Sequence, residues 1–267
     1  MTGPTKRRAK LSMACFTVDP LKVVVGKDES QKMFYIQKEL ICSESEFFAI
    51  ACKDAWKSGR DNTVTLAEND PEIFGVFLVW LTTRDIQNAD GVLSLEFVEQ
   101  EFGKGKQNDA FKDATVNSAS AQFDLLARCY GFGDFIQSMG FCNCAMDHII
   151  SISHHVWKGS NKIIGVAARH IKLVYPLTKV NSRLRQFCID TWVTSVSSKW
   201  VEANIEFYLG RTCDDFLKAI IPRLMVKETW GKEYYPDEYP WVFPWRRQPA
   251  YYHLKPTPEM VNGTVGV

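Results

Sequence analysis

The residue types best suited to chemistry gather in one short stretch, which contains Cys142, Cys144, His148, His154 and His155. All five could bind zinc through a thiolate sulfur or an imidazole nitrogen. The stretch has helical periodicity, however, and residues two apart on a helix point ~200° away from each other, so Cys142 and Cys144 could not reach one ion. Cys144 and His148 share a face, whereas His155 lies about 10 Å farther along the helix. The sequence therefore predicts no metal site while the helix is continuous, and it predicts Cys142 to be a core residue.

Catalytic signatures are missing from the rest of the chain. None of the eight cysteines belongs to a recognisable nucleophile–base pattern in the sequence, and the acidic residues are dispersed. The chain contains no Gly-x-Ser-x-Gly elbow, no His-Glu-x-x-His pair, no Walker-type phosphate loop and no dinucleotide-binding glycine motif. We therefore predict a protein that is not an enzyme and uses no cofactor or metal. An enzyme with a Cys/His site assembled only in three dimensions stays open as an alternative.

Composition narrows the class of protein. Hydrophobic residues make up 46% of the 267 residues and charged residues 24%, as in ordinary globular proteins. The net charge of +1 is too small for non-specific electrostatic binding to the phosphates of a nucleic acid, so a nucleic-acid partner is not expected. No stretch approaches the ~20 apolar residues of a membrane span. The scattered cysteines indicate reduced thiols, and we predict a cytoplasmic or nuclear protein without membrane contact.

Strand patterns occupy the first part of the chain, after a polar, flexible tail over residues 1–18. The sequence "LKVVVG" at residues 21–26 is rich in β-branched residues, and residues 33–36 form a second apolar run. Together they predict a β-hairpin. Residues 62–66, "NTVTL", alternate as a half-buried third strand would.

Helical spacing begins at Lys38 and predicts two short helices, with Ser45 able to cap a new helical turn. After the third strand, Asp70 can cap a longer helix in which Pro71 takes the first position. The apolar stripe of this helix predicts that it runs to about Leu81.

Residues 88–117 contain three glycines and many polar groups, and they predict a long insertion loop, partly ordered at most. A helical hairpin should follow, with its first helix ending near Gly131 and its second capped by Asp134. Later helical segments are predicted at residues 162–174, 182–196 and 213–227.

The last part of the chain, residues 229–267, is rich in aromatic residues and proline. Nine aromatic residues and four prolines lie between Trp230 and Tyr252, which excludes a long helix. This tail either folds back over the helices as a cover or inserts into a partner as an anchored peptide. We favour the cover, because nine exposed aromatic residues would form an aggregation-prone patch.

Taken in this order, the elements resemble the BTB (POZ) domain family, in particular its fungal group with a helical C-terminal extension. The matching segments are "VVVG" (23–26), "FYIQKELICSESEFF" (34–48), "VTLAENDPEIFGVFLVWL" (64–81), "AQFDLLARCYGFGDF" (121–135) and "VYPLTKVNSRLRQFCIDTWV" (174–193). The resemblance implies an α+β fold with a small β-sheet flanked by helices. The expected organisation is a BTB/POZ domain at 19–155 with the insertion at 88–117, an all-helical extension at 156–228 and the aromatic tail.

The resemblance also implies a non-catalytic protein–protein interaction module that associates with a second copy of itself. Asp19, Gln37 and Lys38 occupy the positions of the family's dimer pocket, and Gln37 stands where the family has histidine. The change from strand to helix at this point needs no glycine, because one peptide unit can pass from β to α torsions without a positive φ.

A different role within the family is that of a substrate adaptor for a cullin-based ubiquitin ligase, in which the helix at 70–81, including Phe77, and the helical hairpin after residue 118 face the cullin. Many relatives read Trp-Leu-Tyr-Thr-Gly at the end of this helix. This chain has "WLTTR" at 80–84 and lacks both the tyrosine and the glycine of that region. The self-associating module is therefore our leading hypothesis, and the cullin adaptor is the alternative.

Overall fold

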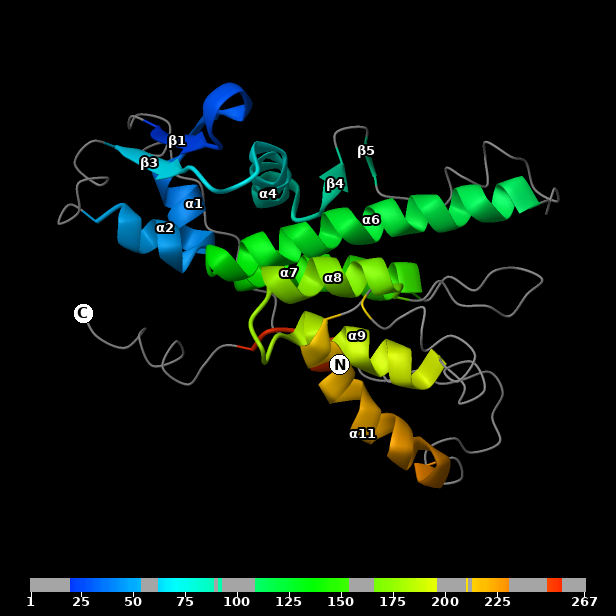
Figure 1. The fold of residues 1–267 in the computed structure, drawn as a ribbon. Helices are drawn as coiled ribbons and strands as arrows, with labels where there is room; N and C mark the ends of the chain where they lie inside the picture. The colour runs from blue at the N-terminus through cyan, green and yellow to red at the C-terminus, as the bar shows by residue number, and fades with distance from the viewer. Residues whose placement is uncertain are drawn as a thin grey trace, which may run out of the picture.

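A computed structural model describes residues 20–53, 62–88, 91–92, 109–153, 166–195, 210, 213–230 and 249–255. Within these residues the protein is α+β, with a small three-stranded sheet and a large share of helix, as the sequence predicts. Figure 1 shows the sheet at one end of the molecule and the helices along the rest of it. No helix of the described residues combines the length and apolar character needed to cross a membrane.

The sheet has the strand order β2-β1-β3. Its strands are β1 (Leu21–Val25), β2 (Lys32–Ile36) and β3 (Thr63–Leu66). The predicted hairpin of β1 and β2 is confirmed, and β3 pairs with β1 in the parallel direction. Val23 and Val64 lie opposite each other and are buried, as expected for the core-facing side of a half-buried sheet.

The change from strand to helix after β2 takes place within one residue. Gln37 has φ −61° and ψ 124°, and its carbonyl accepts the Ile41 N–H at 3.2 Å as the first bond of α1 (Lys38–Glu44). No positive φ is needed, as predicted. Ser45 then caps α2 (Glu46–Ala51) by accepting the Phe48 N–H at 3.3 Å, and its hydroxyl donates to the Ile136 carbonyl at 2.5 Å.

Helix α4 (Pro71–Thr83) begins as the sequence predicts and runs two residues farther than expected. The Asp70 carboxylate accepts the Glu72 N–H at 2.8 Å, and Arg84 ends the helix in the left-handed conformation at φ 64°. One face of α4 is buried, and its aromatic rings contact the rings of Phe132 and Phe141 on the helical hairpin.

The predicted helical hairpin is confirmed as α6 (Asp109–Phe135) and α7 (Met139–Ser153), but its bounds differ from the prediction. Residues 109–117 belong to α6 and not to the insertion loop, because their polar composition, which includes alanine, is also compatible with a helix. Of the remaining insertion, the structure describes the short antiparallel strands β4 (Gln87–Asn88) and β5 (Gly91–Val92).

Helix α6 also continues past Gly131, because its glycines serve close packing there and do not end the helix. A Cβ atom at Gly133 would lie 2.7 Å from the Cys142 sulfur of α7. The helix ends four residues later than predicted, in a turn where Gln137 has φ 55° and the Ser138 N–H bonds to the Gly133 carbonyl at 2.8 Å. The prediction that Asp134 caps α7 is therefore wrong, since Asp134 lies in the last turn of α6.

The predicted helical extension contains α8 (Ala168–Leu177), α9 (Arg183–Ser195) and α11 (Asp214–Trp230). Helix α8 packs on α6, and α9 packs on α8 and α11. Arg185 joins α9 to the end of α8, where its buried guanidinium donates to the Tyr175 carbonyl at 2.5 Å and to the Thr178 carbonyl. A cation there faces the negative end of the α8 dipole.

Part of the aromatic tail returns to the helices as the 3-10 helix η3 (Pro249–Tyr252). Tyr252 is fully buried, packs edge-to-face on Phe187 at 5.5 Å and donates its hydroxyl to Asp190 at 2.8 Å. The Leu254 N–H donates to Asn143 on α7 at 2.7 Å. Residues 249–255 thus cover α7 and α9, whereas residues 1–18 and the aromatic residues at 234–245 lie outside the described residues.

Replacement of Tyr252 by alanine should lower the free energy of unfolding by about 3–5 kcal/mol, because it removes a buried ring and a hydrogen bond to a charged group. Tyr251→Ala is the matched control, since that ring is exposed and its contact with Arg183 contributes about 0.5–1 kcal/mol. Urea unfolding measures both changes. An equally small loss in the two variants would show that η3 does not belong to the core.

Candidate functional site

The outer face of the sheet is the most apolar exposed surface that the strands present. Lys22 lies opposite Tyr35 and Val24 lies opposite Met33, so these four side chains share the face that points away from the core. The side chains on β2 are the most open, since Met33 is 60% exposed and Tyr35 is 63% exposed. Two large apolar groups side by side on one strand are typical of a contact surface.

Among the described residues, strand β2 also lies at the edge of the sheet, with β1 as its only neighbour in the strand order. An edge strand presents unpaired N–H and C=O groups that can pair with another strand. Proteins often protect such edges with charged residues. On β2 the charge is Lys32, at its first position, whereas Met33 to Ile36 are uncharged.

The predicted pocket residues lie next to this edge. Gln37 and Lys38 follow β2 directly and are half-buried, and neither side chain makes a hydrogen bond or ion pair within the described residues. Asp19 lies outside the described residues. The structure thus places two of the three residues beside the exposed strand.

Phe77 has a different position from the one predicted for a cullin-facing residue. Its side chain is fully buried and stacks on Trp80 with a ring separation of 5.8 Å. The reason is the apolar stripe of α4 itself, which faces the core and carries Phe77 with it. On α4, Val79 is the large apolar side chain that is exposed.

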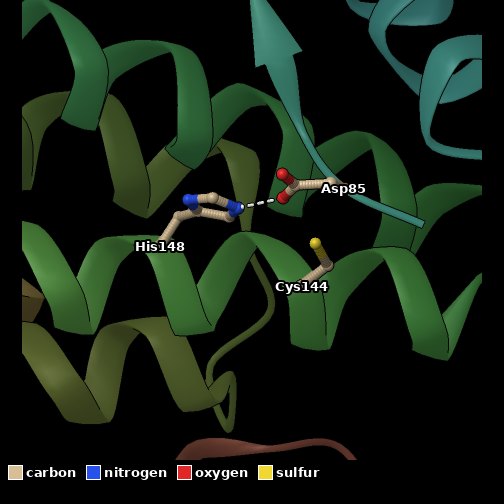
Figure 2. A group of neighbouring side chains, drawn as sticks. All are labelled: Asp85, Cys144 and His148. Carbon is tan, nitrogen blue, oxygen red and sulfur yellow. Dashed lines mark hydrogen bonds and ion pairs between the residues drawn. The ribbon is translucent and has the colours of Figure 1, made fainter. Parts of the chain in front are cut away.

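A cluster of potential ligands forms where the turn after α4 meets α7. Figure 2 shows the Cys144 sulfur and the His148 imidazole, from the same face of α7, with the Asp85 carboxylate across from them. The three ligand atoms lie within 4.8 Å of one another, and His148 Nε2 is 2.7 Å from Asp85 Oδ1. Sequence spacing predicted the shared face of Cys144 and His148 but missed Asp85.

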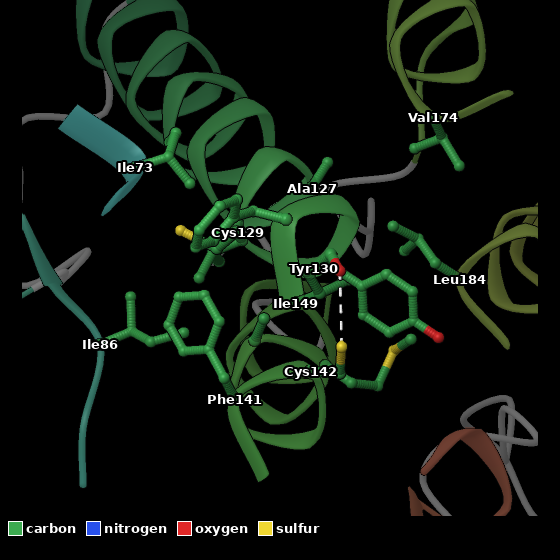
Figure 3. Packing of buried hydrophobic residues seen from close by; sticks show 14 of the residues in the cluster. Ile73, Ile86, Ala127, Cys129, Tyr130, Phe141, Cys142, Ile149, Val174 and Leu184 are labelled. Atoms are coloured by element: carbon green, nitrogen blue, oxygen red, sulfur yellow. Dashed lines mark hydrogen bonds between the residues drawn. The ribbon is translucent and has the colours of Figure 1, made fainter. Parts of the chain in front are cut away.

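The other members of the cysteine and histidine stretch do not join this cluster. Cys142 is fully buried, and its thiol donates to the Tyr130 carbonyl at 3.4 Å (Figure 3). The predicted core position of Cys142 is confirmed, and Cys142 does not belong to the group of ligand atoms around Cys144. His154 and His155 lie outside the described residues.

The cluster is not arranged as a cysteine nucleophile with its base. Burial, together with the Asp85 carboxylate, raises the pKa of Cys144 to about 11, so the thiol keeps its proton at neutral pH. In a catalytic triad the carboxylate bonds one imidazole nitrogen and the nucleophile the other. Here Asp85 bonds Nε2, which is the nitrogen on the side of Cys144.

Ser120, His170 and Asp124 also have the residue types of a catalytic triad, but they are not arranged as one. In a triad the carboxylate accepts a hydrogen bond from the imidazole nitrogen that faces away from the serine. Here the Ala167 N–H donates to that nitrogen, His170 Nδ1, at 2.9 Å, and the Asp124 carboxylate lies 3.7 Å from Nε2, the nitrogen that is 2.6 Å from Ser120 Oγ. The Arg169 guanidinium also donates to Nε2, at 3.3 Å, and to the Ser120 hydroxyl. These contacts hold α8 against α6.

A pair of thiols joins α1 to the end of α2. The Cys42 thiol donates to the Phe48 carbonyl at 3.5 Å, and its interaction with the Cys52 sulfur lowers the pKa of Cys52, as does the charge of Lys38. This pair was not predicted from the sequence, because Cys42 and Cys52 belong to different elements. Cys52 is buried, which keeps its sulfur away from a substrate.

The burial of His170 makes the stability of the protein depend on pH. Burial and the neighbouring Arg169 lower the pKa of His170 from 6.5 to about 4. Below pH 6.5 the unfolded chain binds a proton that the folded chain does not, so the free energy of unfolding should fall between pH 6.5 and pH 4 by on the order of 3 kcal/mol.

Urea unfolding at a series of pH values in this window measures the effect. His170→Gln keeps a polar group at the position but does not titrate there, and its stability should fall less steeply toward acid than that of the wild type. If the free energy of unfolding of the two proteins fell equally steeply with pH, His170 would not be the group responsible.

No model of a protein family matches this chain, and no curated protein matches its sequence. The function is therefore inferred from the exposed strand and from the residue clusters described above.

Proposed function

We propose that this protein is a non-catalytic protein–protein interaction module of the BTB (POZ) type, and that it associates with a second copy of itself through β2. The order of its elements supports the family assignment. A hairpin, two short helices, a third strand, a capped helix and a helical hairpin follow one another along the chain. The geometry of the Ser120 and Cys144 clusters supports a non-catalytic role, since in both the carboxylate lies at the imidazole nitrogen nearest the candidate nucleophile and not at the opposite one.

The exposed apolar pair on β2 is the observation that carries the proposal. Met33 and Tyr35 are more than half exposed and lie on an edge strand. Burial of a large apolar side chain contributes roughly 1.5–3 kcal/mol, and a second strand would also satisfy the open backbone groups of the edge. Both gains come from the same contact.

A second copy of the chain fits this edge by symmetry. If two β2 strands pair in antiparallel fashion about Phe34, Met33 of each copy lies opposite Tyr35 of the other, and Lys32 lies opposite Ile36. The contact is self-complementary, as a two-fold axis requires, and it sets no lysine against another lysine. A sulfur beside an aromatic ring adds a further attraction of about 0.3–1.5 kcal/mol.

Gln37 and Lys38 follow β2 directly and would lie at the rim of this contact. The family resemblance assigns Asp19 to the same pocket. Charged groups at a rim contribute more to the choice of partner and the rate of association than to affinity. We therefore assign affinity to Met33 and Tyr35, and selectivity to Lys38.

Sedimentation equilibrium at micromolar concentration tests the proposal. The wild type should sediment as a dimer, and the double variant Met33→Lys/Tyr35→Lys should sediment as a monomer, because four lysines would then meet at the paired edge. Both positions are exposed, so the fold should persist, which circular dichroism checks. Val180→Lys is the control, since Val180 is 78% exposed in the turn between α8 and α9.

A wild type that remains monomeric at every concentration would overturn self-association. A dimer that survives the double variant would show that the contact lies on another surface of the protein.

A further inference from the structure

Three different ligand atoms converge at one point outside the proposed docking surface. Asp85 supplies a carboxylate oxygen, Cys144 a sulfur and His148 an imidazole nitrogen, and all three lie within 4.8 Å of one another. We propose that these residues bind one divalent transition-metal ion, with Zn²⁺ as the ion of choice. The site goes beyond the proposed interaction function and does not depend on it.

The separations of the ligand atoms are compatible with a tetrahedral site. Zinc–ligand bonds of about 2.0–2.3 Å at tetrahedral angles separate the ligand atoms by roughly 3.4–3.6 Å. The contact between His148 and Asp85, at 2.7 Å, would open by less than about 1 Å. The Cys144 sulfur, which lies no more than 4.8 Å from the other two ligand atoms, would approach them by at most about 1.4 Å. Rotations of the side chains are enough for both changes.

The backbone holds each ligand in place. Cys144 and His148 lie four residues apart on α7, so they project from the same face of one helix. Asp85 follows the left-handed residue that ends α4, and its N–H donates to the Thr83 hydroxyl at 3.2 Å. The Ile86 N–H bonds to Asp85 Oδ1 at 2.9 Å and orients the carboxylate. A metal ion would find the site largely formed.

The charges around the site also favour a cation. Asp85 contributes a carboxylate to the group of ligand atoms itself, and the carboxylate of Asp147, on α7, also acts on the Cys144 sulfur. The neighbouring cation, Arg84, is directed elsewhere, since its guanidinium pairs with Glu44 at 2.9 Å and lies over the Trp80 ring. Arg84 therefore does not occupy the place of a metal ion.

The set of ligand atoms selects the metal. A combination of sulfur, nitrogen and oxygen suits zinc and its neighbours, whereas Mg²⁺ and Ca²⁺ require oxygen ligands. Binding replaces the thiol proton of Cys144 by the metal ion and releases that proton to solvent. The side chains of His148 and Asp85 are 25% and 45% exposed, so water can reach the fourth position.

Such an ion would join the turn after α4 to the middle of α7. These segments are far apart in the sequence, since Asp85 and His148 are separated by 63 residues. Their hydrogen bond already links them, and a metal ion would replace it with three ligand bonds. The predicted consequence is a higher melting temperature with Zn²⁺.

Titration of the reduced full-length chain with Zn²⁺ against a chromogenic chelator tests the proposal. The wild type should bind one ion at this site, and Cys144→Ala and His148→Gln should each weaken binding at least tenfold. With Co²⁺, the wild type should show thiolate-to-cobalt charge-transfer absorption, which Cys144→Ala should abolish. Mg²⁺ and Ca²⁺ should not compete.

Two control variants locate the ion. His253→Gln removes a histidine that pairs with Asp147 at 2.6 Å but has no third ligand among the described residues, and it should bind Zn²⁺ as the wild type does. Cys42→Ser disrupts the other thiol pair and should also leave binding unchanged.

The proposal is overturned if wild-type protein shows no cobalt charge-transfer absorption, or if Cys42→Ser removes it. Folded Cys144→Ala and His148→Gln proteins with undiminished zinc affinity would overturn it as well. The cobalt experiment uses the wild type, so a variant that misfolds still leaves a decisive result.

Discussion

The packing of α4 against the α6–α7 hairpin is the contact on which the rest of the structure depends. The ring of Phe77 lies 5.9 Å from that of Phe132 and 5.2 Å from that of Phe141, and Trp80 also packs on Phe141. Removal of one such buried ring would cost about 3–5 kcal/mol, a large part of the stability of a typical domain. Through this contact the sheet and the hairpin share one core.

The same contact determines which surfaces remain for function. Because the apolar side of the sheet and the stripe of α4 turn toward the shared core, the opposite side of β2 is left open with Met33 and Tyr35 on it. The end of α4 is also brought to α7, which places Asp85 beside His148. One packing arrangement thus produces both the proposed docking edge and the proposed metal site, and the two can be altered independently.

Local features of the chain were predictable because their causes are local. The β-hairpin, the Ser45 and Asp70 caps and the torsions of Gln37 depend on residues a few positions apart. Residues 109–117 and Gly131 were assigned wrongly. Polar residues occur both in loops and on exposed helices, and glycine occurs both at helix ends and at close contacts within helices, so the neighbouring residues do not decide between these alternatives. At Gly133 the deciding partner is Cys142, whose sulfur approaches the helix too closely for a Cβ atom, and at Gly131 it is Leu177, which would leave a Cβ atom only a tight fit.

For the candidate sites, the sequence by itself determined which side chains of one element share a face. Helical spacing predicted that Cys144 and His148 share a face and that Cys142 points into the core, because the geometry of the helix alone sets these directions. The sequence did not show that Phe77 is buried and not available to a partner, nor that Asp85 lies beside α7. Nor did it show that Met33 and Tyr35 lie on an edge strand of the sheet formed by the described residues. Those outcomes were decided only by the tertiary structure, because they depend on which elements meet when the apolar faces of the whole chain are buried together.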